Sequence, residues 1–132
     1  RKWDRELATD DTRREVQAAK DAAGTLHENF MQRATQTYVI SHYAKTSPYP
    51  VLLCGDFNSI PSSYTYHHLR KTLKDGFRTA GNGYMYTYRY AKRMLRIDYI
   101  FHSPSLKGIE YYSPDLDLCS DHNPVIMEVE IQ

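Results

Sequence analysis

The chain has 132 residues, a length that suits one domain or part of one. Its formal net charge is only +1, which removes any global electrostatic argument for binding nucleic acid or a membrane surface. No apolar run approaches the roughly 20 residues of a membrane-spanning helix, so no membrane span is predicted. Cys54 and Cys119 lie in apolar surroundings and are predicted to be buried free thiols.

Residues 1–47 are predicted to be mostly helical. A polar first helix begins near Asp10 and Asp11, which are candidate N-caps, and Gly24 is its predicted end. A second helix over residues 25–45 has an apolar stripe, because apolar side chains recur every four residues at Leu26, Phe30, Ala34 and Tyr38. The Pro48-Tyr49-Pro50 stretch ends it.

Residues 48–132 are predicted to form mainly strands. The apolar run "VLLC" at 51–54 is typical of a strand buried on both faces. "SYTYHHLRKTL" predicts a short helix that brings Tyr66, Leu69 and Leu73 together. The turn signal "GNG" precedes an alternating aromatic strand over 84–90, and three further strands are predicted at "RIDYIFH", "IEYY" and "PVIMEVEI". This order favours a layered α/β sandwich.

Polar side chains interrupt or end these strands. Asp56 and Asn58 close the first strand, Asp98 lies inside an apolar one, and Asp121 and His122 precede the last. A carboxylate in an apolar strand is costly unless a donor or a cation meets it. Carboxylates that hold a divalent cation, a base that activates water and a donor to phosphoryl oxygens are the groups that phosphoester hydrolysis requires.

Each of these residues also has a structural explanation. Asp56 and Asn58 could cap a turn, Asp98 could pair with nearby Arg96, and His122 could be a hydrogen-bonded core histidine. Their conjunction at three strand termini favours function, because turns selected for folding alone would rarely supply it.

Two small basic clusters could contact phosphate, although solvated surface charge explains them more simply. They consist of Lys92, Arg93 and Arg96, and of Arg70, Lys71 and Lys74.

Three motifs in order, "GDFNSIPSS", "RIDYIFHS" and "SDHNPV", resemble the endonuclease/exonuclease/phosphatase superfamily, which has the DNase-I-like fold. The resemblance implies half of a four-layer α/β sandwich, with one mainly antiparallel sheet and helices packed on one face. It also implies hydrolysis of a phosphodiester or phosphomonoester with Mg²⁺ or Mn²⁺. The first motif looks closest to the nuclease and deadenylase branches of the superfamily.

The resemblance also implies a role for each site residue. Asp56 would orient or deprotonate the attacking water, and Asn58 would bind that water or a phosphoryl oxygen. His122 would contact the scissile phosphate, with Asp98 bonded to its other ring nitrogen. Asp121 would lie on the metal side of the site.

A complete member of the superfamily is longer, and its principal metal-binding Glu lies in the first half. The whole chain, residues 1–132, is therefore predicted to be the C-terminal half of such a domain and to bind Mg²⁺ poorly alone. The open sheet face would pack on the N-terminal half or on a second copy in a homodimer. The alternative function is a non-catalytic interaction module that keeps the fold but is inactive without the N-terminal half.

Overall fold

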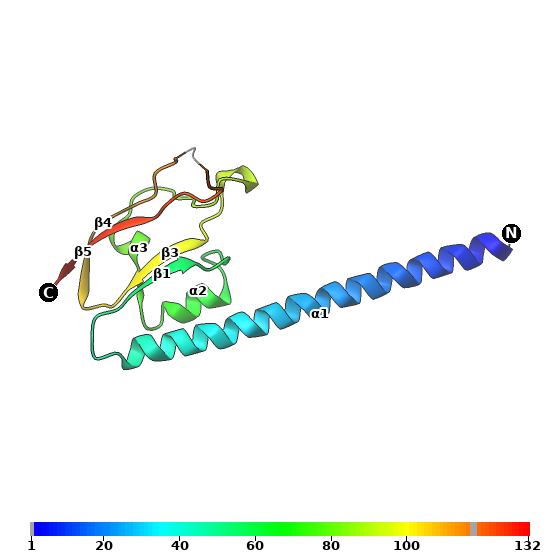
Figure 1. Cartoon of the computed structure of the whole chain (residues 1–132), viewed down its shortest axis with the longest axis horizontal. Coiled ribbons are helices and arrows are strands. Elements are labelled where there is room, and N and C mark those ends of the chain that lie inside the picture. The colour runs from blue at the N-terminus through cyan, green and yellow to red at the C-terminus, as the bar shows by residue number, and fades with distance from the viewer. Residues whose placement is uncertain (1, 117–118) are drawn as a thin grey trace. The chain divides into compact units, whose positions relative to one another are not determined.

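The computed structural model describes residues 2–116 and 119–132, with the backbone alone for residues 2–9. It forms two compact units, residues 1–35 and residues 36–132. The elements, shown in Figure 1, are α1 (Lys2–Thr46), β1 (Leu52–Asp56), α2 (Tyr64–Leu69), β2 (Lys74–Asp75), α3 (Gly76–Ala80), the 3-10 helix η1 (Ala91–Arg93), β3 (Asp98–His102), β4 (Leu106–Tyr112) and β5 (Ile126–Ile131).

The described residues of the first unit, 2–35, are all helical. The predicted helical character is correct, but the predicted break at Gly24 is wrong, because α1 continues through this residue. A glycine inside a helix costs only about 1 kcal/mol relative to alanine, and the neighbouring alanines favour the helix. Leu26 and Phe30 of the predicted apolar stripe are exposed. No helix in the described part of the chain has both the length and the apolar composition for crossing a membrane.

The second unit is built on a three-stranded sheet in the order β1-β3-β2, with both neighbouring pairs antiparallel. One face of this sheet carries Tyr99 and Phe101, which are buried against the predicted trio Tyr66, Leu69 and Leu73. In Figure 1, α2 and the last turns of α1 lie along this side of β1 and β3. The core therefore lies between the sheet and its helices, as the sequence predicts.

On the other face of the sheet, strand β1 is open, although His102 of β3 is buried there. Leu52 is 49% exposed and Cys54 is exposed, so the prediction that β1 is buried on both faces is wrong. Cys119 is exposed too, and neither thiol is the buried group predicted from the sequence. The physical reason is that α1 and α2 cover the face with Tyr99 and Phe101, whereas on the other face α3 reaches His102 of β3 but leaves Leu52 and Cys54 of β1 uncovered.

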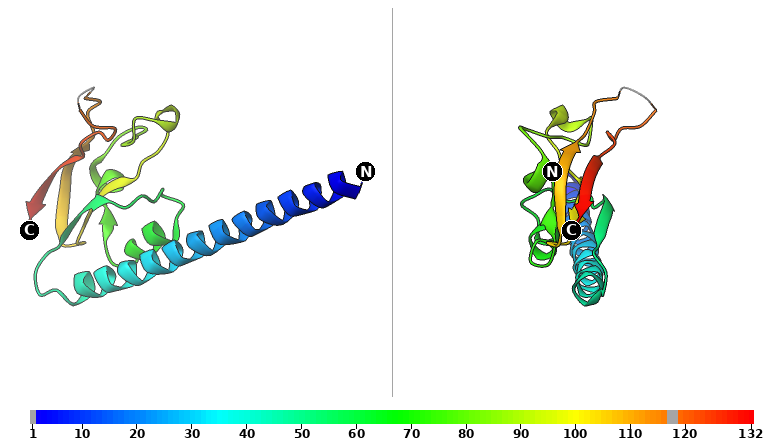
Figure 2. Two further views of the ribbon diagram at one scale, coloured as in Figure 1. Left: turned by 45° about the vertical axis from the view of Figure 1, so that its right-hand side comes forward. Right: turned by 90° about the vertical axis from the view of Figure 1, so that its left-hand side faces the viewer.

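Strands β4 and β5 form a second antiparallel ladder, seen as two neighbouring arrows in the right-hand view of Figure 2, so the strands make two ladders rather than one. Its register shifts between Gly108 and Glu110, which marks a bulge. The start of α3 packs closely beside it, because a Cβ added at Gly76 would lie 2.7 Å from the Met127 sulfur and from the Ile100 carbonyl oxygen.

The aromatic segment 84–90 is not the strand that its alternation predicts. Tyr88 makes only isolated bridges, to Leu95 and His122. The hydroxyl of Thr87 accepts hydrogen bonds from the backbone N–H groups of Ile97 and Asp98, at 3.0 and 3.1 Å. The segment is therefore held against the entrance to β3 by a side chain rather than by a regular ladder.

A buried ion pair joins the helices to the sheet. The Arg96 guanidinium donates to both carboxylate oxygens of Asp75, at 3.1 and 2.9 Å, and Asp75 is 1% exposed. Asp75 also accepts from the Tyr66 hydroxyl at 2.7 Å and from the Phe77 N–H at 3.0 Å, which caps α3. Arg96 is thus the partner of Asp75, and the structural alternative of an Asp98–Arg96 pair is wrong.

Replacing Asp75 with alanine leaves the Arg96 charge buried without its counter-ion. We expect the free energy of unfolding to fall by about 3–5 kcal/mol, the usual cost of breaking a buried pair. Glu130→Ala is the control, because Glu130 pairs with Lys107 at a site where both side chains are 58% exposed, and its loss should cost about 0–1 kcal/mol. Urea denaturation of both variants provides the measurement, and equal losses would contradict the expectation.

Candidate active site

Two carboxylates face each other where β1 ends and β3 begins. Asp56 is the last residue of β1 and Asp98 the first of β3, and the antiparallel register places them directly opposite. Like charges in this relation repel, which is destabilising unless a positive group lies between them. The arrangement therefore calls for a cation or a protonated base at this end of the sheet.

His122 supplies such a group. Its Nδ1 lies 2.8 Å from Oδ2 of Asp98, and its Nε2 lies 3.7 Å from Oδ2 of Asp56. Since an ionised carboxylate can only accept, the proton of this short bond is on Nδ1. The predicted hydrogen bond between Asp98 and His122 is confirmed.

Backbone contacts hold the imidazole in place. The N–H of His122 donates to the Ser120 hydroxyl at 3.1 Å, and the next N–H, that of Asn123, donates to the Thr87 carbonyl at 2.7 Å. The ring packs edge-to-face on Tyr88, with 5.4 Å between centroids. Thr87 and Tyr88 were missed by the sequence reasoning, since their alternating pattern predicts an ordinary strand.

The Asp98 carboxylate raises the pKa of His122, chiefly through the hydrogen bond to Nδ1. Partial burial acts in the opposite direction, and the negative charges of Asp98, Asp56 and Asp121 raise the pKa further. The protonated imidazole, with an N–H on Nε2, is the form that donates to an anion.

The loop after β1 is fixed by β3. The Tyr99 hydroxyl bonds to the carbonyl oxygens of Ser59 and Arg96, both at 2.7 Å, and the Phe57 N–H bonds to the Ile97 carbonyl at 2.9 Å. Burial of the Tyr99 hydroxyl raises its pKa, so it remains a neutral donor. These bonds give the loop that follows Asp56 a defined path.

All five predicted site residues lie near this end of the sheet, but only three of them form the central cluster. Asp56, Asp98 and His122 form one cluster whose ligand atoms lie within 4.8 Å of one another. Asp121 is exposed, with Oδ1 3.9 Å from Nε2 of His122. Asn58 joins through its backbone, because its N–H donates to Oδ1 of Asp56 at 2.8 Å and its φ is 46°.

The cluster is a possible metal site, and its donor chemistry favours oxygen ligands. Asp98 and His122 are occupied with each other, and a protonated imidazole cannot ligate a metal. Asp56 and Asp121 are the carboxylates that remain, both beside Nε2 of His122. Two carboxylates fit a hard divalent cation, although such an ion needs more oxygen ligands than these two side chains supply.

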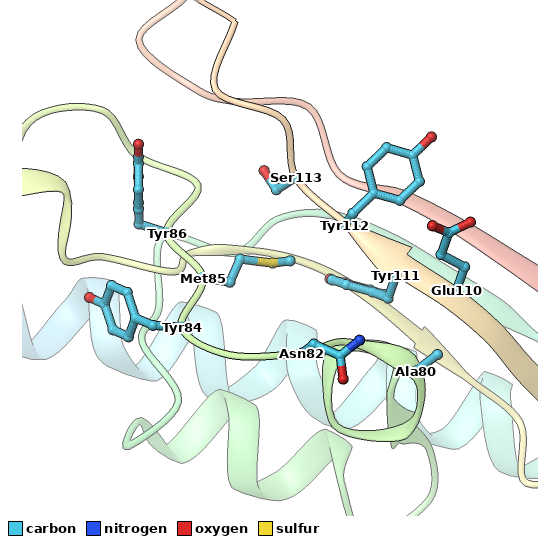
Figure 3. A pocket seen from close by; sticks show the side chains of 9 residues that line it. All are labelled: Ala80, Asn82, Tyr84, Met85, Tyr86, Glu110, Tyr111, Tyr112 and Ser113. Atoms are coloured by element: carbon cyan, nitrogen blue, oxygen red, sulfur yellow. The ribbon is translucent and has the colours of Figure 1, made fainter.

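A separate hollow of about 320 Å³ lies between residues 80–86 and residues 110–113. Met85 and Tyr111 point toward each other across it, as Figure 3 shows. None of the five predicted site residues is among the described residues that line it. The acidic cluster is therefore an open surface site rather than part of this hollow.

The sequence pattern that defines the endonuclease/exonuclease/phosphatase family matches residues 10–122. The chain belongs to this family. No curated protein matches the chain. Family members are typically hydrolases that use divalent metals, which agrees with the carboxylates and imidazole of the cluster.

Three solved bacterial structures share the fold, and each covers about three quarters of this chain. A functionally unknown conserved protein from Enterococcus faecalis V583 has a TM-score of 0.65 at 23% identity, over 76% of this chain and 44% of its own. An endonuclease/exonuclease/phosphatase from Bacteroides vulgatus has a TM-score of 0.66 at 26% identity, with the same coverages. The mannosyl-6-phosphatase Bt3783 of Bacteroides thetaiotaomicron VPI-5482 has a TM-score of 0.61 at 21% identity, over 75% and 44%.

These neighbours confirm the predicted DNase-I-like α/β class of the chain. The chain spans 44% of the length of each of these three structural neighbours.

Replacing Asp98 with asparagine tests the electrostatic origin of the His122 titration. The pKa of His122 should fall toward its ordinary value, about 6.5, once the carboxylate is gone. Because the folded-state pKa is raised, the pair adds stability that is fully present below the unfolded-state pKa and is lost as pH rises through the folded-state pKa.

NMR titration of His122 measures the pKa, and urea unfolding at about pH 5.5 and about pH 9 measures the linked stability. The difference between wild type and Asp98→Asn should be larger at the lower pH. The control is Glu130→Gln, which removes a carboxylate that pairs with Lys107 on exposed β5 and has no contact with His122 among the described ion pairs. An unchanged His122 pKa in Asp98→Asn would contradict the assignment.

Proposed function

We propose that this chain is the C-terminal catalytic half of a divalent-metal-dependent phosphoester hydrolase that uses an activated water. One observation carries the proposal: the juxtaposition of Asp56, Asp98 and His122 at one end of the sheet, with Asp121 beside them. The substrate is a phosphodiester or a phosphomonoester, because the same groups serve both. Membership of the endonuclease/exonuclease/phosphatase family supports this class of reaction.

In this mechanism Asp56 orients the attacking water and accepts its proton. Its Oδ1 receives the Asn58 N–H, which leaves Oδ2 directed toward the imidazole side of the site. The Asn58 side chain hydrogen-bonds the water or a phosphoryl oxygen. Because Asp56 is exposed, water reaches its carboxylate freely.

His122 donates a hydrogen bond from Nε2 to a phosphoryl oxygen and stabilises the negative charge that grows there. The bond from the water oxygen to phosphorus replaces the ester P–O bond, and the leaving oxygen takes a proton from solvent. Asp98 is a positioning residue, since it holds the ring through Nδ1 and favours the protonated form. Asp121 would lie on the metal side of the site and hold Mg²⁺ or Mn²⁺. The bound ion would neutralise charge on the phosphoryl oxygens.

The proposal includes a partner that completes the site. The chain spans 44% of the length of its structural neighbours, and one face of its sheet is open at Leu52 and Cys54. We propose that the N-terminal half of the domain packs on this face and contributes further metal ligands. A homodimer through the same face is the competing arrangement.

The second candidate function is a non-catalytic interaction module. It is favoured by the exposure of Asp56 and Asp121, which leaves the cluster on a wet surface where charges are screened. Metal-dependent hydrolysis by the completed domain distinguishes the two functions, because an interaction module has none.

Asp56→Asn and His122→Ala test the catalytic roles in the domain completed by its N-terminal half. Each variant should lower the rate of Mg²⁺-dependent hydrolysis of a nitrophenyl phosphate diester or monoester by about 10²–10⁴-fold, the usual effect of losing a base or an oxyanion donor. Glu130→Gln, on exposed β5, is the control and should retain full activity. Wild-type rates in both site variants would reject the proposal.

The chain by itself should bind Mg²⁺ weakly and turn over little phosphoester. A tightly octahedral ion needs about six oxygen ligands, and this chain offers Asp121 and Asp56 on an open surface. Its open sheet face should also drive self-association.

Hydrolysis of the same substrates and sedimentation velocity, with and without the N-terminal half added in trans, measure both expectations. Addition of the N-terminal half should restore hydrolysis and abolish self-association of the chain. Robust metal-dependent activity from the monomeric chain would show that the half-site interpretation is wrong.

A further inference from the structure

A basic groove lies in the helical layer of the second unit. It has a volume of about 520 Å³ and runs between the end of α1 and the segment that begins with α2. Its polar lining comprises Ser41, His42, Lys45, His68, Lys71 and Thr72. None of the residues of the acidic cluster is among the described residues that line it.

Helical spacing explains why these groups meet. Ser41 and Lys45 are four residues apart on α1 and so lie on one side of it. His68 is in the last turn of α2, and the turn that follows α2 brings Lys71 and Thr72 to the same groove. The two elements are joined by the contact of 3.3 Å between the hydroxyls of Ser41 and Thr72. The lysines of both elements therefore face a common space.

The groove is rich in donors and has no carboxylate in its described lining. Among the ion pairs of the described residues, none involves Lys45 or Lys71. Lys45 lies in the last turn of α1 and Lys71 just beyond the C-terminus of α2, so the negative ends of two helix dipoles favour cations at both places. A neutral imidazole still offers one N–H, so His42 and His68 add donors.

Aromatic rings form one wall of the groove. Tyr38 and His68 line it, with 6.5 Å between their ring centroids, and the Tyr64 ring, which is not part of the lining, stacks on His68 at 5.6 Å. The space exceeds what a phosphate ion alone would fill. An aromatic wall beside two ammonium groups suits a phosphate attached to a ring, such as a nucleoside monophosphate or a sugar phosphate.

The groove is separate from the acidic cluster. The helices pack on the sheet face that carries Tyr99 and Phe101, whereas Asp98 belongs to the alternate set of β3 side chains. We propose that the basic groove is a second ligand site, which binds the phosphate of a small phosphorylated ligand through Lys45 and Lys71. This proposal does not depend on catalysis at Asp56 and His122.

Calorimetric titration of the 132-residue chain with AMP in metal-free, low-salt buffer tests the site. The double variant Lys45→Gln/Lys71→Gln should weaken the Kd by roughly tenfold or more, because two charge-assisted contacts are lost. The matched control is Lys20→Gln/Lys107→Gln, which removes the same charge from exposed positions elsewhere and should leave the Kd nearly unchanged. The thermal midpoints of both double variants should equal that of the wild type.

Three further arms separate the competing explanations. Inorganic phosphate should compete with AMP but bind more weakly, since it lacks the ring. Asp56→Asn should bind AMP as the wild type does, which separates this site from the catalytic one. Equal weakening in both double variants, binding of a ten-residue oligothymidylate without binding of AMP, or no saturable binding of AMP would each overturn the proposal.

Discussion

Asp75 and Arg96 form a buried pair on which four segments converge. Asp75 receives the Tyr66 hydroxyl from α2 and caps α3, while Arg96 stands two residues before Asp98 at the entrance to β3. The guanidinium lies between the rings of Phe77 and Tyr99, at 4.7 and 4.8 Å from their centroids. Burial alone would lower the pKa of Arg96, but the hydrogen bond and charge of Asp75 outweigh it. The start of β3, and with it Asp98, is thereby tied to the helical layer.

The candidate active site brings together two carboxylates that repel each other, and contacts elsewhere in the fold have to hold them together. Antiparallel pairing puts the carboxylates of Asp56 and Asp98 opposite each other, which opposes folding until His122 is in position. The contact between Tyr88 and His122, and the bonds from Thr87 to the strand entrance, hold the imidazole there. A site with this excess of negative charge favours cations and a protonated ring.

The basic groove and the proposed surface for the N-terminal half lie on opposite faces of the β1–β3 pair. The face with Tyr99 and Phe101 is covered by helices of the same chain, and the basic groove lies in that covering layer. The other face, with Leu52 and Cys54, is open and is where the remaining part of a family domain would pack. A phosphate ligand in the groove and a phosphoester at Asp56 would therefore occupy separate places.

Local patterns in the sequence determined the helices, most of the strands and the residues of the acidic cluster, because caps, periodicity and strand-end motifs depend only on neighbouring residues. Tertiary contacts decided the rest. Gly24 does not end α1, segment 84–90 bends around the site instead of pairing, and Arg96 bonds to Asp75 rather than Asp98. The paths of segment 84–90 and of Arg96 depend on partners distant in the sequence. At Gly24, helix-favouring neighbours outweigh the cost of one glycine. The meeting of Lys45 with Lys71 is decided in the same way, since only the packing of α1 beside α2 brings the two charges to one groove.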